Sequence, residues 1–367
     1  MKAQEVARRR LRNTGLTGDR FQSPHEIVAW HGAMQAQEYG LAKWSIGQRA
    51  SGAVDQDVDQ ALEGGSIVRT HVLRATWHFV AAPDIRWMLA LTAPRVRRHV
   101  ASRFLELGLD QRTLVRCETV FASALAGNRT LTREELGRVL VDAGVDTAGQ
   151  RLPFILLHGE LEGLICSGGL SGKQHTYALF DDRVPKSARF DRDEALVELV
   201  RRYLQSHGPA TAQDLGWWSS LPMADVRNGL HLLGSAVRSE IIDGTTFWLL
   251  STDTRTPRSS NRLHLLQLYD EALVGYTESR FFGDPREATA RAAWRDRSLP
   301  SGVLLIENGV GGHWKRTAKK DVVTLEAFLY EEPSSDILRR LEAAAAEMGR
   351  FLGREARVEL RSLDRRR

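Results

Sequence analysis

The chain has 367 residues, with 51 lysines and arginines against 46 acidic residues and a formal net charge of +5. Its length predicts two or three domains, and its 42% hydrophobic and 26% charged content excludes a disordered or fibrous chain. No apolar run approaches the ~20 residues that a membrane-spanning helix needs, and the basic N-terminus lacks the apolar stretch of a secretory signal. The two cysteines, Cys117 and Cys166, are too few for a disulfide framework. We therefore expect a cytoplasmic protein without a membrane partner.

The cationic residues comprise 44 arginines and only 7 lysines. A GC-rich genome explains such a bias, and so does binding to phosphate, which the arginine fork contacts in a bidentate manner. The net charge alone supports nucleic-acid binding only weakly.

An N-terminal helix and a first three-helix unit are predicted over residues 1–82. The unit begins at Ser23-Pro24-His25-Glu26, a capping-box spacing with proline at the first helical position. Further helical segments and two strands follow it. Residues 83–110 are predicted to form two connecting helices.

A second unit with the same order of elements is predicted over residues 111–185. Thr132, followed by Glu134 and Glu135, begins one of its helices, and a β-hairpin is expected around Lys173. The third unit, residues 186–250, shows this order most clearly. Thr211 caps its second helix, Gly234 ends its third, and Asp243-Gly244 predicts a hairpin turn.

Helix, helix, helix, hairpin is the order of a winged helix-turn-helix module, so we predict three such modules in tandem. Residues 251–262 are predicted to be a polar linker. Residues 263–367 read as a β-rich α+β lobe, with strands over 264–278 and 302–317, a turn at Asn308-Gly309, and a terminal helix capped by Ser334 or Ser335. The predicted fold class is α+β.

Familiar catalytic motifs are absent from the sequence, which has no GxSxG, P-loop, HExxH or CxxC pattern. The triplet Gln35-Ala36-Gln37 is the one candidate for a catalytic motif in this sequence. Glutamines on a helix are usually solvated, and residues i and i+2 of a helix lie ~200° apart. In extended backbone or at a helix end, however, the two amides can converge on one site. We expect both to open onto the same hollow.

Four segments in chain order resemble the AlkZ-type winged-helix DNA glycosylases: MQAQEYGLAKWSIGQR, VLRATWHFVAAPDIRWM, LYDEALVGYTESR and LLIENGVGGHWKR. The family is typified by interstrand-crosslink repair and self-resistance enzymes of antibiotic-producing bacteria. Its most specific motif, Gln-x-Gln, falls on Gln35 and Gln37, whereas a sister group carries Gln-x-Asp. The resemblance implies three winged helices in a curved, DNA-sized scaffold, with both glutamines in its concave face.

The resemblance also implies a monofunctional DNA glycosylase that excises N7-alkylated purines from double-stranded DNA, including bulky or crosslinked adducts. The role would be base-excision repair or self-resistance to a genotoxin, in the cytoplasm at the nucleoid. Such a base already carries a positive charge and needs no general acid. The remaining tasks are to hold a water beside C1′ and to stabilise cationic charge, and an amide carbonyl can do both. We expect Gln37 to position the water and Gln35 to orient it or the sugar, with no metal or other cofactor.

Other residues are predicted to contact DNA. Arg74, Thr76 and His78 alternate along VLRATWHFV and would share one face of a strand, although this segment also fits a wing with no such role. In the GVGGHWKR hairpin, the candidates are Asn308, His313, Lys315 and Arg316, with Trp314 either a wedge or part of the core. Asp270 and Glu271 are expected to orient structure rather than to catalyse.

A non-enzymatic winged-helix transcriptional regulator is the main alternative, because this fold most often serves transcription. Its candidate recognition helix in the third module has only Arg227 and His231 as cationic or titratable residues, which argues against sequence reading. A protein-interaction scaffold is a third possibility. We expect a monomer with no protein partner, because three modules already supply a surface that wraps around DNA.

Overall fold

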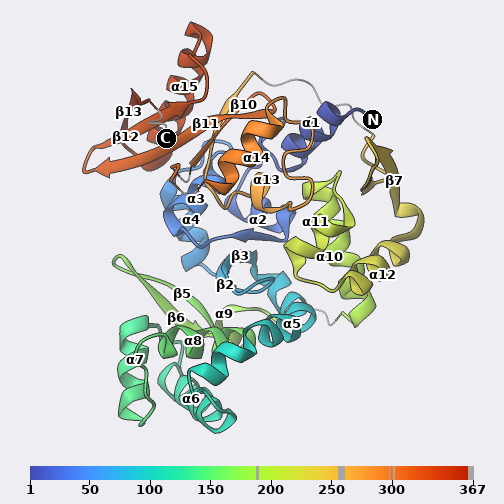
Figure 1. Ribbon diagram of the computed structural model, residues 1–367. Coiled ribbons are helices and arrows are strands. Elements are labelled where there is room, and N and C mark those ends of the chain that lie inside the picture. The colour runs from blue at the N-terminus through green and yellow to red at the C-terminus, as the bar shows by residue number, and fades with distance from the viewer. Residues whose placement is uncertain (187–189, 255–260, 297, 301, 363–367) are drawn as a thin grey trace.

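The computed structural model describes residues 1–186, 190–254, 261–296, 298–300 and 302–362. These residues form a mixed α/β fold with four sheets (Figure 1). No helix in these ranges combines the length and apolar character needed to cross a membrane.

The N-terminal helix and the first unit consist of four helices and three strands, and the strands form one small sheet. The strand order of this sheet is β1-β3-β2. In chain order the elements are α1 (Ala3–Asn13), α2 (Pro24–His31), β1 (Ala33–Gln35), α3 (Tyr39–Gly47), α4 (Asp55–Glu63), β2 (Ile67–His71) and β3 (Trp77–Ala81).

The start and end of α2 follow from local sequence. Ser23 Oγ accepts a hydrogen bond from the Glu26 N–H at 3.2 Å, which confirms the predicted cap. Gly32 adopts φ +78° directly after the helix, a conformation that glycine reaches without strain. The chain leaves the helix there and enters β1, which pairs antiparallel with β3.

The second and third units repeat the order of the first. The second consists of α6 (Gln111–Ala124), β4 (Leu131–Thr132), α7 (Arg133–Asp142), α8 (Arg151–Leu161), β5 (Ile165–Ser171), β6 (Gln174–Leu179) and α9 (Phe180–Arg183). The third consists of α10 (Arg192–His207), α11 (Ala212–Ser219), α12 (Met223–Leu233), η2 (Gly234–Ala236), β7 (Val237–Ile242) and β8 (Thr245–Leu250).

In each unit an extended segment after the first helix pairs with the last strand: β1 with β3, β4 with β6, and Ala210 with Trp248 of β8. The predicted caps at Thr132 and Thr211 are confirmed, as are the helix end at Gly234 and the turn at Asp243-Gly244. The shared pairing shows that the three units have one architecture despite dissimilar sequences.

The prediction of two connecting helices over residues 83–110 is wrong. After the short η1 (Ala82–Asp84), a single helix, α5 (Ile85–Glu106), runs through Pro94. Proline removes a hydrogen bond inside a helix, but buried side chains on both sides of it, including Met88 and Val96, hold this helix in the core.

The C-terminal lobe contains a five-stranded sheet of order β13-β12-β11-β10-β9. Its elements are β9 (Leu263–Leu266), α13 (Glu271–Val274), α14 (Glu287–Arg295), β10 (Gly302–Ile306), β11 (Gly309–Lys319), β12 (Val322–Leu329), α15 (Ser335–Leu352) and β13 (Glu355–Leu360). Of the predicted linker over residues 251–262, positions 255–260 lie outside the described residues.

Two expectations for this lobe are wrong. The strand predicted over residues 264–278 ends at Leu266, because the Asp270 carboxylate accepts a hydrogen bond from the Ala272 N–H and begins a helical turn instead. The β10–β11 turn is formed by Glu307 and Asn308, one residue earlier than predicted, since Ile306 pairs with Gly309. Ser334 caps the terminal helix as expected.

The first sheet lies between two cores. One face packs on α5, α10 and α11, and the other packs on α3, α4 and the C-terminal sheet. Two tryptophan hydrogen bonds fasten the lobe's strand β9 to its surroundings, from Trp44 Nε1 to the Leu265 carbonyl and from Trp314 Nε1 to the Leu266 carbonyl. Two long hairpins, β5–β6 and β11–β12, project on the same side of the molecule (Figure 1).

Candidate active site

The Gln35-Ala36-Gln37 triplet lies at the end of β1 and in the bend that leads to α3. The backbone is therefore extended rather than helical, the geometry in which two amides at i and i+2 can face one side. The structure nevertheless gives the two side chains different surroundings.

Gln35 is buried, with 7% of its surface exposed. Its side-chain carbonyl accepts a hydrogen bond from Arg74 Nη2 at 2.9 Å, and its backbone N–H donates to Glu271 Oε1 at 2.7 Å. Arg74 Nη1 also donates to the Trp218 carbonyl at 2.7 Å. Arg74 thus holds the side-chain carbonyl of Gln35 and Glu271 holds its backbone, and the expectation that both amides open onto one hollow is wrong for this residue.

Glu271 organises the interior side of this region. Its second carboxylate oxygen lies 3.2 Å from His207 Nε2 and accepts a hydrogen bond from Trp218 Nε1 at 3.0 Å. Burial by itself raises the pKa of this carboxyl, but the His207 hydrogen bond, the nearby Arg74 charge and the Gln35 N–H outweigh burial and lower the pKa to about 2. Glu271 is therefore ionised near neutral pH, and its expected orienting role agrees with this geometry.

Gln37 is exposed and forms no hydrogen bond within the described part of the chain. Its neighbour Ala36 is fixed on both sides of the peptide. The Ala36 N–H donates to the Trp77 carbonyl at 2.7 Å, and the Ala36 carbonyl accepts from Arg69 Nε at 3.1 Å. The backbone that carries Gln37 is anchored while its amide remains open to solvent.

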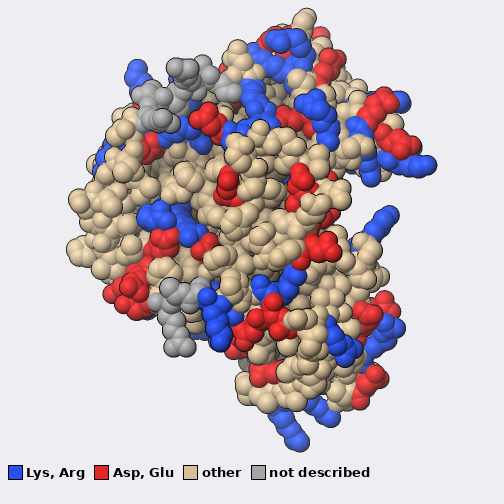
Figure 2. All heavy atoms as spheres, turned by 180° about the vertical axis from the view of Figure 1, so that it is seen from behind, with Lys and Arg blue, Asp and Glu red and all other residues tan. Residues whose placement is uncertain are grey.

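The segment after Gln37 lies between the two projecting hairpins. A Cβ on Gly40 would come within 3.1 Å of Arg316 Nη2 from β11, and the Tyr39 ring lies 4.3 Å from the His175 ring of β6. On the edge where these hairpins project, the surface is notched between the upper and lower parts of the molecule (Figure 2). Gln37 therefore precedes a segment that the two hairpins flank.

Arg74, Thr76 and His78 do not share one strand face, because β3 begins only at Trp77. Arg74 and Thr76 lie in the β2–β3 loop and line the same cavity. His78 is fully buried in the central strand of the sheet, paired with Gln35 on one side and with Thr70 on the other. Its predicted DNA contact is wrong, since no part of the ring reaches the surface.

The β11–β12 hairpin divides its predicted DNA contacts into two groups. His313 and Trp314 are buried, His313 bonded to the Pro300 carbonyl and the Tyr330 hydroxyl, and Trp314 bonded to Leu266. Both belong to the lobe's own packing, so the predicted DNA contact of His313 is wrong, and Trp314 takes the core position rather than that of a wedge. Lys315 is exposed beside Glu326, and Arg316 is half-buried beside Gly40.

Asn308 belongs to the opposite end of β11 from the Gln37 segment. It is in the turn that begins this strand, about 25 Å along the strand from Arg316 at the usual rise per residue. It lines a small cavity with residues of α1 instead. A role shared with Arg316 at one site is therefore not supported.

Arg69 is a neighbour of the triplet that the sequence interpretation missed. Besides bonding to Ala36, its guanidinium lies 4.3 Å from the Trp77 ring centre, and burial lowers its pKa. Arg69 and Trp77 lie on the paired strands β2 and β3, so the register of this pairing brings them together. Among the described residues, no group of three or more His, Cys, Asp or Glu side chains is arranged to hold a metal ion.

Comparisons with known proteins agree with this architecture. Residues 28–351 match the model of a family described as DNA glycosylase AlkZ-like. The chain is similar to the interstrand DNA cross-link repair glycosylase of Streptomyces sahachiroi, with 23% identity over 324 residues, 82% of this chain and 84% of that protein. It also resembles the solved structure of Streptomyces sahachiroi DNA glycosylase AlkZ, with a TM-score of 0.79 and 21% identity over 99% of this chain and 100% of that one.

These findings define the protein as a DNA glycosylase, an enzyme rather than a transcriptional regulator. The chain belongs to the AlkZ-like family, since the family model covers most of its length. The family resemblance drawn from the sequence is confirmed, and the assignment to the Gln-x-Gln subgroup stays a prediction.

Proposed function

We propose that this glycosylase hydrolyses the N-glycosidic bond of cationic N7-alkylated purines in double-stranded DNA, including bulky adducts and interstrand crosslinks. The similar protein of Streptomyces sahachiroi is an interstrand DNA cross-link repair glycosylase, which supports the crosslink substrate. Base-excision repair or self-resistance to a genotoxin, at the nucleoid, is the corresponding role.

The exposed amide of Gln37 carries this proposal. It stands on backbone fixed by Trp77 and Arg69, and it precedes the segment beside Arg316. A side-chain carbonyl in such a place accepts a hydrogen bond from water and directs a negative dipole at developing positive charge.

The reaction needs no protonated side chain at the base. Water held by the Gln37 carbonyl adds to C1′ of the sugar, and the C1′–N9 bond breaks as its electron pair neutralises the cationic purine. The proton of the water passes to solvent, leaving an abasic sugar and a neutral alkylpurine. Glu271 does not serve as an acid, because it is buried and ionised.

Gln35 acts through position rather than by direct contact with water. Its carbonyl is occupied by Arg74 and its N–H by Glu271, so β1 ends at a defined point. The direction of the following bend, and with it the place of the Gln37 amide, depends on these two bonds.

We interpret the three repeated units as winged-helix modules, over residues 1–82, 111–185 and 186–250, with the lobe at 263–367 completing a curved scaffold for DNA. The notch between the hairpins is the proposed DNA-binding surface (Figure 2). Lys315 and Arg316 supply phosphate contacts from β11, and the protein acts as a monomer.

Base release from an oligonucleotide that contains N7-methylguanine tests the proposal. We expect the wild type to release the free base and leave an alkali-labile site, and Gln37→Ala to lose ~10²–10³ in rate. The matched control is Gln60→Ala, because Gln60 is an exposed glutamine on α4 of the same unit. No base release by the wild type, or an unchanged rate for Gln37→Ala, contradicts the proposal.

A further inference from the structure

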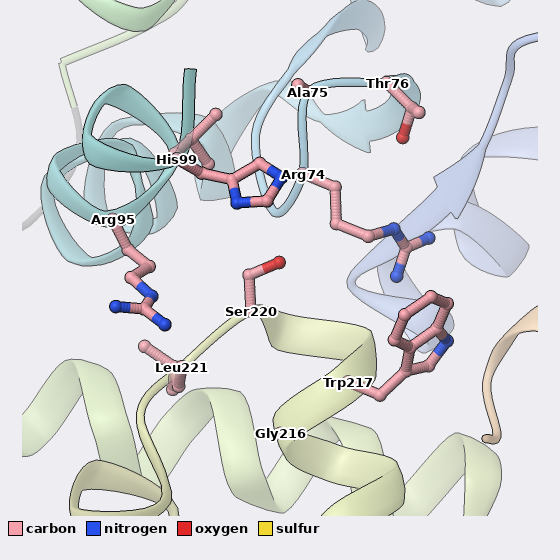
Figure 3. A pocket seen from close by; sticks show the side chains of 10 residues that line it. Arg74, Ala75, Thr76, Arg95, His99, Gly216, Trp217, Ser220 and Leu221 are labelled. Carbon is pink, nitrogen blue, oxygen red and sulfur yellow. The ribbon is translucent and has the colours of Figure 1, made fainter. Parts of the chain in front are cut away.

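An open cavity of about 410 Å³ lies between α5, the β2–β3 loop and the C-terminal end of α11. The lining side chains with polar or aromatic groups come from all three elements (Figure 3): Arg74, Thr76, Arg95, His99, Trp217 and Ser220. Its volume is in the range of small-molecule sites. None of the roles described above accounts for the side chains on the α5 and α11 walls.

The α5 wall of the cavity carries an arginine and a histidine. Arg95 and His99 are one helical turn apart, so both side chains lie on the same face of α5. Both are exposed, and neither forms an ion pair with a described residue. Among the described residues that line the cavity, none carries a carboxylate. An anion entering here meets uncompensated positive charge, and arginine suits phosphate geometry in particular.

The α11 wall carries an exposed indole. Trp217 is 48% exposed, whereas the adjacent Trp218 is fully buried and bonded to Glu271. Exposed tryptophan beside arginine is the combination that proteins use to stack nucleic-acid bases while holding the backbone. The two walls therefore match the two parts of a nucleotide.

Arg74 connects the cavity with the candidate active site. Its guanidinium points between the β2–β3 loop and Trp217 (Figure 3), and it is bonded to the Gln35 side chain. Arg74 thus separates a ligand in the cavity from Gln35 of the glutamine motif.

We propose that this cavity, the α5–α11 pocket, binds a nucleotide of the substrate strand, with its phosphate at Arg95 and His99 and its base or sugar against Trp217. The inference deepens the proposed function and rests on it, because it makes DNA the ligand. The pocket holds one nucleotide of the strand while Gln37 acts on the damaged one.

Binding to a duplex that contains a tetrahydrofuran abasic analogue tests the pocket apart from catalysis, because that duplex has no base to release at this position. Fluorescence anisotropy over a series of salt concentrations gives the affinity and its salt slope. We expect the Arg95→Ala/His99→Ala variant to bind roughly tenfold more weakly and to lower the slope by about 1. Trp217→Ala is expected to lose roughly tenfold, and Trp217→Phe to restore most of it because it keeps a stacking face.

Arg98→Ala is the matched control, because Arg98 is an exposed arginine of α5 that does not line the pocket. Circular dichroism establishes that each variant is folded. If the pocket variants bind the duplex as tightly as Arg98→Ala does, the proposal is overturned.

A competition with free dAMP separates the strand nucleotide from a free one. If unlabelled DNA displaces the labelled duplex and dAMP does not, the pocket holds a nucleotide only as part of a strand. If dAMP also displaces the duplex, and this displacement is lost in Arg95→Ala/His99→Ala, the pocket recognises the same nucleotide chemistry in free form. The proposed function fails separately, through the absence of base release from N7-methylguanine DNA by the wild type. Base release with unaltered duplex affinity in all pocket variants overturns the pocket alone.

Discussion

The two glutamines of the triplet have opposite surroundings, one at the end of β1 and the other in the bend that follows. Gln35 is buried and bonded to Arg74 and Glu271. Two residues later, Gln37 is exposed ahead of a segment that lies between hairpins of the second unit and the C-terminal lobe. The same amide group is a structural part in one place and a free polar group in the other.

This difference shows that two identical residues of one motif can have different roles. Buried polar groups lose the water that solvates them and therefore need partners, and Gln35 has found its own. The open amide keeps its hydrogen-bonding capacity for a substrate. Substitutions around the buried glutamine and around the exposed one are therefore expected to affect different measurements.

The largest expected effect is on the interior side. Glu271→Ala removes the acceptor of the Gln35 N–H and of Trp218 Nε1 and leaves these buried donors unpaired. Breaking a buried ionic group in this way costs about 3–5 kcal/mol. We expect that loss in the free energy of unfolding, measured by urea denaturation. A loss of activity with unaltered stability would show that Glu271 belongs to the chemistry instead.

The pH dependence of stability sharpens the same point. The pKa of Glu271 is lowered from 4.5 to about 2 in the folded chain, so its stabilising contribution is fully present above about pH 4.5 and is lost as pH falls toward 2. The difference in unfolding free energy between wild type and Glu271→Gln should therefore become smaller as the pH is lowered from 5 to 3. A difference that stays constant over this window would contradict the assignment.

Arg74→Ala tests whether Gln35 acts through position. Without the bond to the Gln35 carbonyl, the end of β1 is less well defined, and misplacement of a reacting group costs up to roughly 10²-fold in rate. We expect base release to slow by roughly tenfold or more, measured in single turnover at saturating enzyme. An unchanged single-turnover rate would mean that the Arg74–Gln35 bond has no part in the reaction.

Arg316→Ala tests the notch side. Its guanidinium lies beside Gly40 and faces no ion-pair partner among the described residues, so we expect it to meet a phosphate. The variant should bind duplex DNA several-fold more weakly, and the salt slope should fall by about 1. Equal affinity and slope for wild type and variant would remove this hairpin from the DNA-binding surface.

The smallest expected effect concerns Trp314. Trp314→Phe keeps the buried ring but loses the hydrogen bond to the Leu266 carbonyl, at a cost of about 1 kcal/mol in unfolding free energy. DNA affinity should not change, because the side chain is 1% exposed. If the variant binds DNA more weakly without losing stability, Trp314 contacts DNA as a wedge, the other role that the sequence allowed.

Local signals predicted the elements well. Ser23, Thr132, Thr211 and Ser334 all cap helices, and Asp243-Gly244 forms the expected turn. These predictions succeed because a cap or a tight turn involves residues only a few positions apart. The mistaken split of α5 has the opposite cause, since buried packing outweighed the local preference at Pro94. The mistaken strand over residues 264–278 overlooked a local signal, the cap at Asp270.

The sequence by itself determined the family, the order of the elements and the position of the glutamine motif, because these depend on residues close together in the chain. Only the tertiary structure decided which glutamine is exposed. That choice depends on Glu271, 236 residues away from Gln35, and on Arg74 in the β2–β3 loop, which both bond to Gln35. Burial is a property of the packed molecule, and no spacing of residues along the chain records it.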